Sequence, residues 1–334
     1  SYDGYHGATD YPLADILPLH SAQQDGDFLP EYIVGRISVN NSSDISNVIS
    51  KTLTYEKGRQ PDSWFESAAL VADPSSSGIS TITTNQYIEN IMENYGMDDI
   101  RTNYDEVCTG SLTTSCSDYN NWTEAQFTDH VLYYNYRGYY GANWSLDWNL
   151  LNSSMYAPFV ASLTCGTGDF NGTSDSENFY RTGSESSPKG AVAAVGVATT
   201  GTHTAYNNIV HMGMYEGIFS RGMYHAGAAV EMGRTRLFLT YPTNPASSVS
   251  RFSTWTNLIG DPALHLWSDI PHNFVINPPE SIPESTTSLS MNVADENGSF
   301  VKDARVTLMF GDGCDCDYLA DDCLDTCDYF TDYT

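Results

Sequence analysis

One cysteine at the end of an apolar strand pattern is the residue of this chain best suited to nucleophilic chemistry. The run 159–170 reads FVASLTCGTGDF and places Cys165 directly before Gly166. In α/β sheets, reactive groups lie at the carboxyl ends of strands, where glycines let backbone N–H groups approach a developing oxyanion. The pattern indicates a thiol nucleophile, although a buried structural cysteine has the same local appearance.

A thiol nucleophile requires a base or a positive charge beside it, because a free thiol is mostly protonated near neutral pH. The chain has eight histidines. His203 follows the apolar run 190–199, and His130 precedes the apolar run 131–136, so these two are the candidate bases. Neither belongs to a motif, and a structural or solvent-exposed role is the open alternative for both.

The charge of the chain excludes several classes of partner. Its 334 residues carry 42 acidic and 14 basic side chains, a formal net charge of −28. Nucleic acids and anionic lipid surfaces would repel such a protein. The longest apolar run, 190–199, is shorter than the roughly 20 residues that cross a membrane, and no signal peptide is evident. Because the chain opens on Ser1, we expect a mature or partial chain.

Cysteine spacing and composition favour an extracellular protein. Six of the seven cysteines fall into a Ser/Thr-rich loop and an acidic tail, and we expect disulfides among them: Cys108, Cys116, Cys314, Cys316, Cys323 and Cys327. A zinc site in the tail is the alternative, although the spacing differs from the usual Cys-x₂-Cys knuckle. Disulfides, abundant Asp and few Lys are typical of a secreted or cell-surface protein.

Asn-x-Ser/Thr triplets permit glycosylation without requiring it, because chance alone gives about five in a chain of this composition. They begin at Asn40, Asn41, Asn121, Asn143, Asn152, Asn171 and Asn297. Acidic clusters could bind Ca²⁺, although they follow no EF-hand spacing. These clusters are Asp25/Asp27 and Asp312/Asp315/Asp317. No cofactor is required by any motif, and no metal-ligand set is assigned.

Alternating β and α patterns predict an α/β domain with a mainly parallel sheet and helices on both faces. The expected strands are 32–39, 68–72, 131–136, 158–165 and 190–199. The expected helices run from a Ser43/Asp44 cap to Gly58, over 85–95, and twice between Asn207 and Tyr241. This domain covers residues 1–270 and places Cys165 at a strand end.

The remaining residues predict a separate β module. A Pro-rich linker covers 271–285, and a partial immunoglobulin-like (Ig-like) domain with a Cys/Asp-rich tail covers 286–334. The runs 288–294 and 304–310 alternate in polarity around Asn297-Gly298, as in the first hairpin of a β-sandwich. Too few strands remain to close a sandwich. Either the record is truncated or another chain donates strands.

Six segments in a fixed order resemble the gingipain-type cysteine peptidases. They read DGDFLPEYIVGRISV, VISKTLTYEK, SAALVAD, VLYYNYRG, SLTCGTGDF and LIGDPAL. The resemblance implies a caspase-like α/β fold followed by an Ig-like domain. It also implies a Cys-His dyad that cleaves after Arg or Lys.

Carried over by position, the resemblance assigns Cys165 as the nucleophile and exposes a departure at the base. The family's histidine stands in a Gly-His-Gly turn, where this chain has Gly138, Tyr139 and Tyr140. A phenol is a poor base for a thiol at neutral pH. The family's acidic residue that orients the histidine matches Asp10, and Asp27 matches an acidic position near the substrate cleft.

The sequence therefore leaves two main functional hypotheses and one further alternative. The first is a proteolytically degenerate domain that serves as an extracellular, filament-like structural or assembly glycoprotein. Its expected partners are further copies or other extracellular chains, joined by strand donation, with glycans as a further possibility. The second is an active cysteine endopeptidase whose base is relocated to His203 or His130. The third is a module that binds peptides without cleaving them.

Overall fold

The computed structural model describes most of the chain, which divides into the units Ser1–Pro271 and His272–Thr334. The described residues are 8–14, 30–57, 62–74, 78–104, 117–138, 146–243, 248–277, 279, 282, 285–302, 304 and 306. Within them, no helix is long and apolar enough to cross a membrane.

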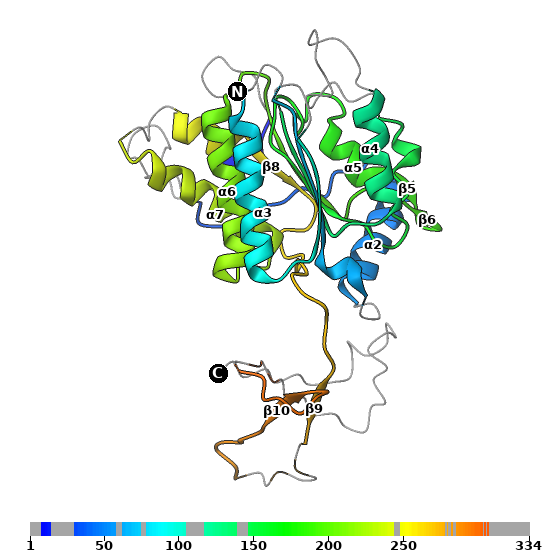
Figure 1. The fold of residues 1–334 in the computed structure, drawn as a ribbon, viewed down its shortest axis with the longest axis vertical. Helices are drawn as coiled ribbons and strands as arrows, with labels where there is room; N and C mark the ends of the chain where they lie inside the picture. Colours follow the sequence, from blue (N-terminus) through cyan, green and yellow to red (C-terminus); the bar gives the residue numbers. More distant parts are fainter. Residues whose placement is uncertain are drawn as a thin grey trace. The chain divides into compact units, whose positions relative to one another are not determined.

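The first unit is built on a six-stranded sheet with the strand order β2-β1-β3-β4-β7-β8 (Figure 1). Its strands are β1 (Ser67–Ala72), β2 (Asp99–Asn103), β3 (Tyr133–Arg137), β4 (Phe159–Ser162), β7 (Ala193–Val197) and β8 (Thr256–Ile259). All neighbouring pairs are parallel except β7 and β8, which are antiparallel. The sheet is therefore mainly parallel, as the alternating pattern predicts.

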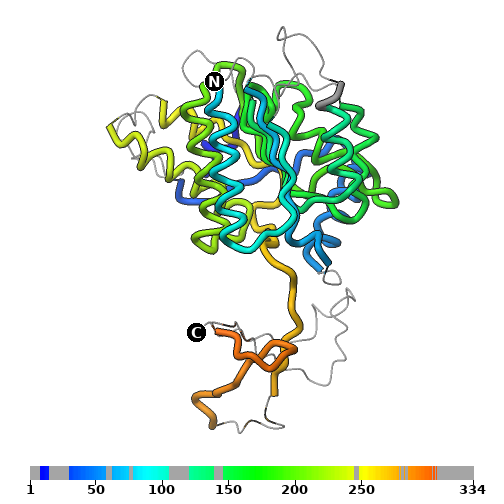
Figure 2. The backbone as a smooth tube through the Cα atoms, in the orientation of Figure 1, coloured from blue at the N-terminus to red at the C-terminus, as the bar shows by residue number. Residues whose placement is uncertain are grey.

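Helices cover both faces of this sheet (Figures 1 and 2). One face carries α3 (Ser80–Tyr95), α6 (Thr204–Arg221) and α7 (Ala226–Thr240). The other carries α2 (Ser42–Glu56), α4 (Ser117–Thr128) and α5 (Asp175–Arg181). Shorter elements are α1 (Tyr11–Ala14), α8 (Ser250–Trp255), the 3₁₀ turns Ser63–Glu66 and Trp148–Leu150, and the ribbon β5 (Gly183–Ser184) with β6 (Ser187–Pro188).

All strands of the sheet except β2 are buried along their whole length, because helices cover both faces of the sheet. Every residue of β1, β3, β4, β7 and β8 is buried. Such strands are expected to be apolar throughout. β3 departs most from this expectation, since it buries both Asn135 and the charged Arg137. These two buried polar side chains point to a special environment at the end of β3.

Segment 32–39 differs from the expected buried strand. Tyr32 and Ile37 are each 58% exposed, and only Arg36 forms a bridge to the sheet, with Ile259. Two bonds make this bridge: Arg36 N donates to the Leu258 carbonyl at 2.9 Å, and Gly260 N donates to the Arg36 carbonyl at 2.9 Å. β8 pairs with β7, so segment 32–39 lies beyond β8, at the outer edge of the sheet.

Helix α2 begins two to three residues earlier than a Ser43/Asp44 cap predicts. Asn41 is the N-cap, and its side chain accepts a hydrogen bond from Asp44 N at 3.1 Å. The helix buries Asn47, Val48, Lys51 and Tyr55. Its apolar residues at helical spacing face outward instead: Ile45, Ile49 and Leu53 are exposed.

The described part of the second unit contains a short antiparallel pair, β9 (Phe274–Ile276) with β10 (Val293–Asp295). The expected turn at Asn297-Gly298 is present, and Asp295 Oδ1 accepts from the backbone N–H groups of Asn297 and Ser299. Ala294 bridges to Phe300 across this turn. β9 lies within the segment expected to be a linker. The Ig-like sandwich itself stays a prediction.

Candidate functional site

Cys165 lies three residues beyond β4, at the carboxyl edge of the sheet. Its side chain is buried, with 6% of the residue exposed. Gly166 has a φ of 71°, in the left-handed region that favours glycine, and its N–H donates to the Thr199 carbonyl at 2.8 Å. Gly168 N donates to the Val197 carbonyl at 3.0 Å. The turn after the thiol is therefore bonded to the end of β7.

The side-chain hydroxyls of Thr164 and Thr167 stabilise the same turn by hydrogen bonds. Thr167 Oγ1 donates to the Ser162 and Thr164 carbonyls at 2.5 and 2.9 Å and accepts from Val197 N at 3.2 Å. Thr164 Oγ1 donates to the Gly138 carbonyl at 2.7 Å, just beyond β3. Cys165 is thus fixed between the ends of β3 and β7. Such rigid placement suits a reactive group.

The Cys165 thiol contacts a hydroxyl and not an imidazole. Its Sγ lies 3.1 Å from Thr202 Oγ1. Among the described residues, no histidine nitrogen lies within hydrogen-bonding distance of Sγ, and the thiol is free of any disulfide. The backbone N–H of Cys165 also has no acceptor among the residues that the structure describes. That N–H is available to a developing oxyanion.

Neither candidate base is hydrogen-bonded to the thiol, although His203 directly follows Thr202 in the chain. His203 is the exposed N-cap of α6, and its Nδ1 accepts from Ala205 N at 3.1 Å. This bond leaves the proton of the neutral ring on Nε2, which therefore cannot accept another. His130 precedes β3, and the parallel pairing of β3 with β4 puts it at the edge of the sheet opposite Cys165. There its ring stacks on Tyr156 with ring centroids 4.3 Å apart.

Arg137, at the end of β3, is a functional candidate that sequence reasoning missed. Its guanidinium is fully buried and donates to the Leu163 carbonyl and to Asn208 Oδ1. Burial lowers the pKa of Arg137 to about 10, and negative charge on Tyr136 and Cys165 acts in the opposite direction. The signal in the sequence was an arginine directly after an apolar strand pattern.

His211 lies on α6 three residues after Asn208, the residue that accepts from Arg137, and it is also buried. Both ring nitrogens lack a hydrogen-bond partner among the described residues, and the residue has no exposed surface. Burial, and then the charge of Arg137, lower the pKa of His211 well below its usual range. The imidazole is therefore neutral at physiological pH.

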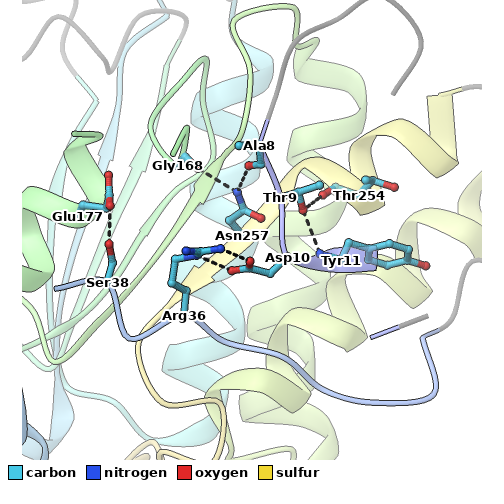
Figure 3. A network of polar contacts seen from close by, with 10 residues as sticks. All are labelled: Ala8, Thr9, Asp10, Tyr11, Arg36, Ser38, Gly168, Glu177, Thr254 and Asn257. Atoms are coloured by element: carbon cyan, nitrogen blue, oxygen red, sulfur yellow. Dashed lines mark hydrogen bonds and ion pairs between the residues drawn. The ribbon is translucent and has the colours of Figure 1, made fainter. Parts of the chain in front are cut away.

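Asp10 is bound to an arginine. Arg36 Nε donates to Asp10 Oδ2 at 2.8 Å, and Arg36 Nη2 donates to Asp10 Oδ1 (Figure 3). Nearby, Asn257 Nδ2 donates to the Ala8 and Gly168 carbonyls, each at 2.9 Å. This network ties residues 8–11 to the turn that carries Cys165. Among the described residues, neither Asp10 oxygen contacts a histidine.

The comparison that decides the family covers most of the first unit. The model of peptidase family C25 matches residues 1–267. This chain belongs to peptidase family C25. The resemblance to gingipain-type cysteine peptidases, drawn from the ordered motifs, is thereby confirmed.

Individual relatives of this C25 chain are similar over limited lengths. Lys-gingipain of Porphyromonas gingivalis is 37% identical over 62 residues, which are 18% of this chain and 4% of that protein. The Arg-specific gingipain R superposes with a TM-score of 0.66 at 20% identity, over 85% of this chain and 65% of that one. A complex of pro- and mature domains from the same organism gives 0.69 at 19%, over 88% and 70%. The structural matches show the fold.

In this C25 chain Gly138, the first residue of the turn that the resemblance aligned with the family's Gly-His-Gly, is described and is buried beyond β3. Tyr139, Tyr140 and Asp27 lie outside the described residues. So do the six cysteines expected in disulfides, Asn143, and both acidic clusters considered for Ca²⁺. The other Asn-x-Ser/Thr asparagines are all exposed: Asn40, Asn41, Asn121, Asn152, Asn171 and Asn297. The described residues contain no group of three or more ligands that could bind a metal.

Arg36→Met is expected to destabilise the C25 domain by about 1 to 2 kcal/mol, because the mostly buried Asp10 carboxylate loses its charged partner. Urea unfolding measures the change. Arg101→Met is the matched control, since Arg101 pairs with Asp99, whose side chain is 44% exposed against 12% for Asp10, and an ion pair to an exposed carboxylate contributes less than about 1 kcal/mol. Equal effects of the two substitutions would contradict a special role for the Asp10 network.

Proposed function

We propose that this chain is a C25 domain that has lost peptide hydrolysis and acts as a structural or assembly module outside the cell. The observation that carries the proposal is the environment of Cys165, whose thiol contacts the Thr202 hydroxyl and no imidazole among the described residues. The sequence agrees, because Tyr139 stands where the family has histidine.

Amide hydrolysis by a thiol needs a group that gives a proton to the departing amine. A threonine hydroxyl and a tyrosine phenol both hold their protons too tightly near neutral pH to do so. His203 binds the start of α6 through Nδ1, and His130 lies at the other edge of the sheet. The nucleophile is therefore present without its general acid and base.

An extracellular structural role is supported by the surface and by the second unit. The described Asn-x-Ser/Thr sites are exposed, as glycan attachment requires. Phe274, Val275 and Phe300 of the second unit are exposed, and such apolar strand residues are covered when another chain adds a strand. We propose self-association, or binding of other extracellular chains, by strand addition there, with disulfides in the loop and tail. Ca²⁺ binding by the acidic clusters belongs to the same proposal.

A peptide-cleavage screen tests the loss of hydrolysis. The wild-type chain is expected to cleave no Arg- or Lys-containing peptide in a manner that depends on Cys165. Tyr139→His combined with Tyr140→Gly rebuilds the Gly-His-Gly turn and is expected to raise hydrolysis at least about tenfold, since a positioned base contributes about 10² to 10⁴.

Cys165→Ala, placed in both backgrounds, is the control for this screen. Wild-type cleavage that Cys165→Ala abolishes would overturn the proposal. If His203→Ala also abolished that cleavage, the relocated-base peptidase would replace it. Assembly is tested separately by light scattering of the full chain over a range of concentrations. A monomer at every concentration would contradict self-association.

A further inference from the structure

Two exposed histidines face each other across an isolated β-bridge, at the edge of the sheet opposite Cys165. His225 immediately precedes α7, His265 follows β8, and the two residues form an antiparallel bridge. Because β8 runs antiparallel to β7, the chain leaves β8 at the amino edge of the parallel strands. Tyr133, the first residue of β3, confirms this position by donating to the Trp267 carbonyl. The histidine pair is therefore separate from the site around the thiol.

The hydrogen bonds of the bridge place the two histidine side chains on one face and close together. Ala226 N donates to the Leu264 carbonyl at 2.9 Å. Leu266 N donates to the Tyr224 carbonyl at 2.6 Å. These two bonds flank the histidines, which are thus a non-hydrogen-bonded antiparallel pair, the arrangement in which opposite side chains approach most closely. Leu264 and Leu266 are buried, so the alternation of an extended chain turns His265 outward.

The separation of the two rings fits two ligands of one metal ion. The ring centroids of His225 and His265 lie 5.5 Å apart, with an angle of 82° between the ring planes. Zn–N bonds of about 2.0–2.1 Å put the centroids of two imidazoles on one tetrahedral ion about 5 Å apart. Both residues are exposed, so an ion can reach them from solvent. Small rotations of the two side chains are enough to direct a nitrogen of each ring at the same ion.

Both rings have a nitrogen available for a ligand. His225 is the N-cap of α7, yet its side chain makes no capping hydrogen bond. In the described part of the chain, neither histidine forms an ion pair. Partial burial, and then the charge of His225, lower the pKa of His265, while its own backbone carbonyl acts in the opposite direction. A neutral imidazole with one nitrogen at a carbonyl presents the other nitrogen to a metal.

We propose that His225 and His265 bind one divalent transition-metal ion of the zinc and copper class. Imidazole is a favoured ligand of Zn²⁺, Cu²⁺ and Ni²⁺, whereas Ca²⁺ prefers oxygen ligands. The remaining coordination positions belong to water, because the described residues contain no group of three or more His, Cys, Asp or Glu that could hold a metal. The site is an open one and differs in chemistry from the acidic clusters considered for Ca²⁺.

Zn²⁺ binding by the full chain near neutral pH, measured by isothermal titration calorimetry, tests this site. His225→Ala and His265→Ala are each expected to weaken the binding of one ion at least tenfold. The cysteine-rich tail is present in every variant, so any ion that it binds cancels in the comparison. His272→Ala is the matched control, because His272 is an exposed histidine outside the pair, bonded to Glu296, and unchanged Zn²⁺ binding is expected.

Electron paramagnetic resonance of bound Cu²⁺ identifies the ligands independently. The wild-type spectrum is expected to contain a signal split by two nitrogen ligands, and this signal is expected to be lost in both single variants. His225→Gln and His265→Gln replace the alanine variants if circular dichroism shows that either of those is unfolded. Equal Zn²⁺ affinity in wild type and in both folded single variants overturns the proposal, and so does an equal loss in His272→Ala.

Discussion

Gly168→Ala is expected to destabilise the domain by about 3 kcal/mol or more, because two backbone segments meet at this residue. A Cβ at Gly168 would lie 2.6 Å from the carbonyl carbon and 2.9 Å from the Cα of Gly196 on β7. Neither backbone can move without breaking the bond from Gly168 N to Val197 or the bond from Asn257 to the Gly168 carbonyl. Overpacking of this kind usually costs about 1 to 3 kcal/mol, and more where backbone must shift.

Urea unfolding measures this effect, and Gly166→Ala provides the matched control in the same turn. A Cβ at Gly166 would lie 3.5 Å from Thr200 Cγ2, which is an ordinary contact, so only its φ of 71° opposes the change. That strain costs about 1 to 2 kcal/mol. Alkylation of Cys165 is also expected to accelerate in Gly168→Ala, as the turn loosens. A Gly168→Ala variant as stable as wild type would show that the two segments can separate freely.

Lys51 is expected to give the domain a stability that rises between about pH 7 and pH 10. Lys51 lies on the buried face of α2, and its ammonium donates to the Tyr180, Thr182 and Lys189 carbonyls. Burial lowers the pKa of Lys51 to about 7, from 10.5 in the unfolded chain. Among the described residues, no carboxylate pairs with it.

The sign of the pH dependence follows from proton counting. Between about pH 7 and 10 the unfolded chain binds a proton at Lys51 that the folded chain does not bind. Stability therefore rises with pH in this window, by at most about 1.4 kcal/mol per pH unit from this group. Below about pH 7 both states are protonated, and the contribution of Lys51 is at its least favourable and constant.

Lys51→Met removes this dependence. At pH 7 it is expected to destabilise the domain by about 1 to 3 kcal/mol, because three carbonyls lose their donor. The difference in unfolding free energy from wild type is then expected to widen toward pH 9. Lys57→Met is the control, since Lys57 is exposed at the end of the same helix. A difference that is constant from pH 7 to 9 would show that Lys51 remains charged in the folded protein.

Local sequence patterns correctly predicted most of the strands of the central sheet. Continuous apolar runs predicted β1, β3, β4 and β7, and the helix expected over 85–95 ends at Tyr95 as α3 does. The segment 32–39 has an equally apolar pattern, but β8, from more than 200 residues later, occupies the place beside β7. Strand order is a long-range outcome, so composition alone could not distinguish a sheet strand from a segment outside the edge.

The sequence by itself determined the α/β class and the position of Cys165 at a strand end. These follow from residue type and spacing, which are local. Only the tertiary structure decided what contacts the thiol: Thr202 Oγ1, from the loop beyond β7, lies 3.1 Å from Sγ. Such contacts depend on distance in space, and parallel strands bring together residues that the chain separates by tens of positions.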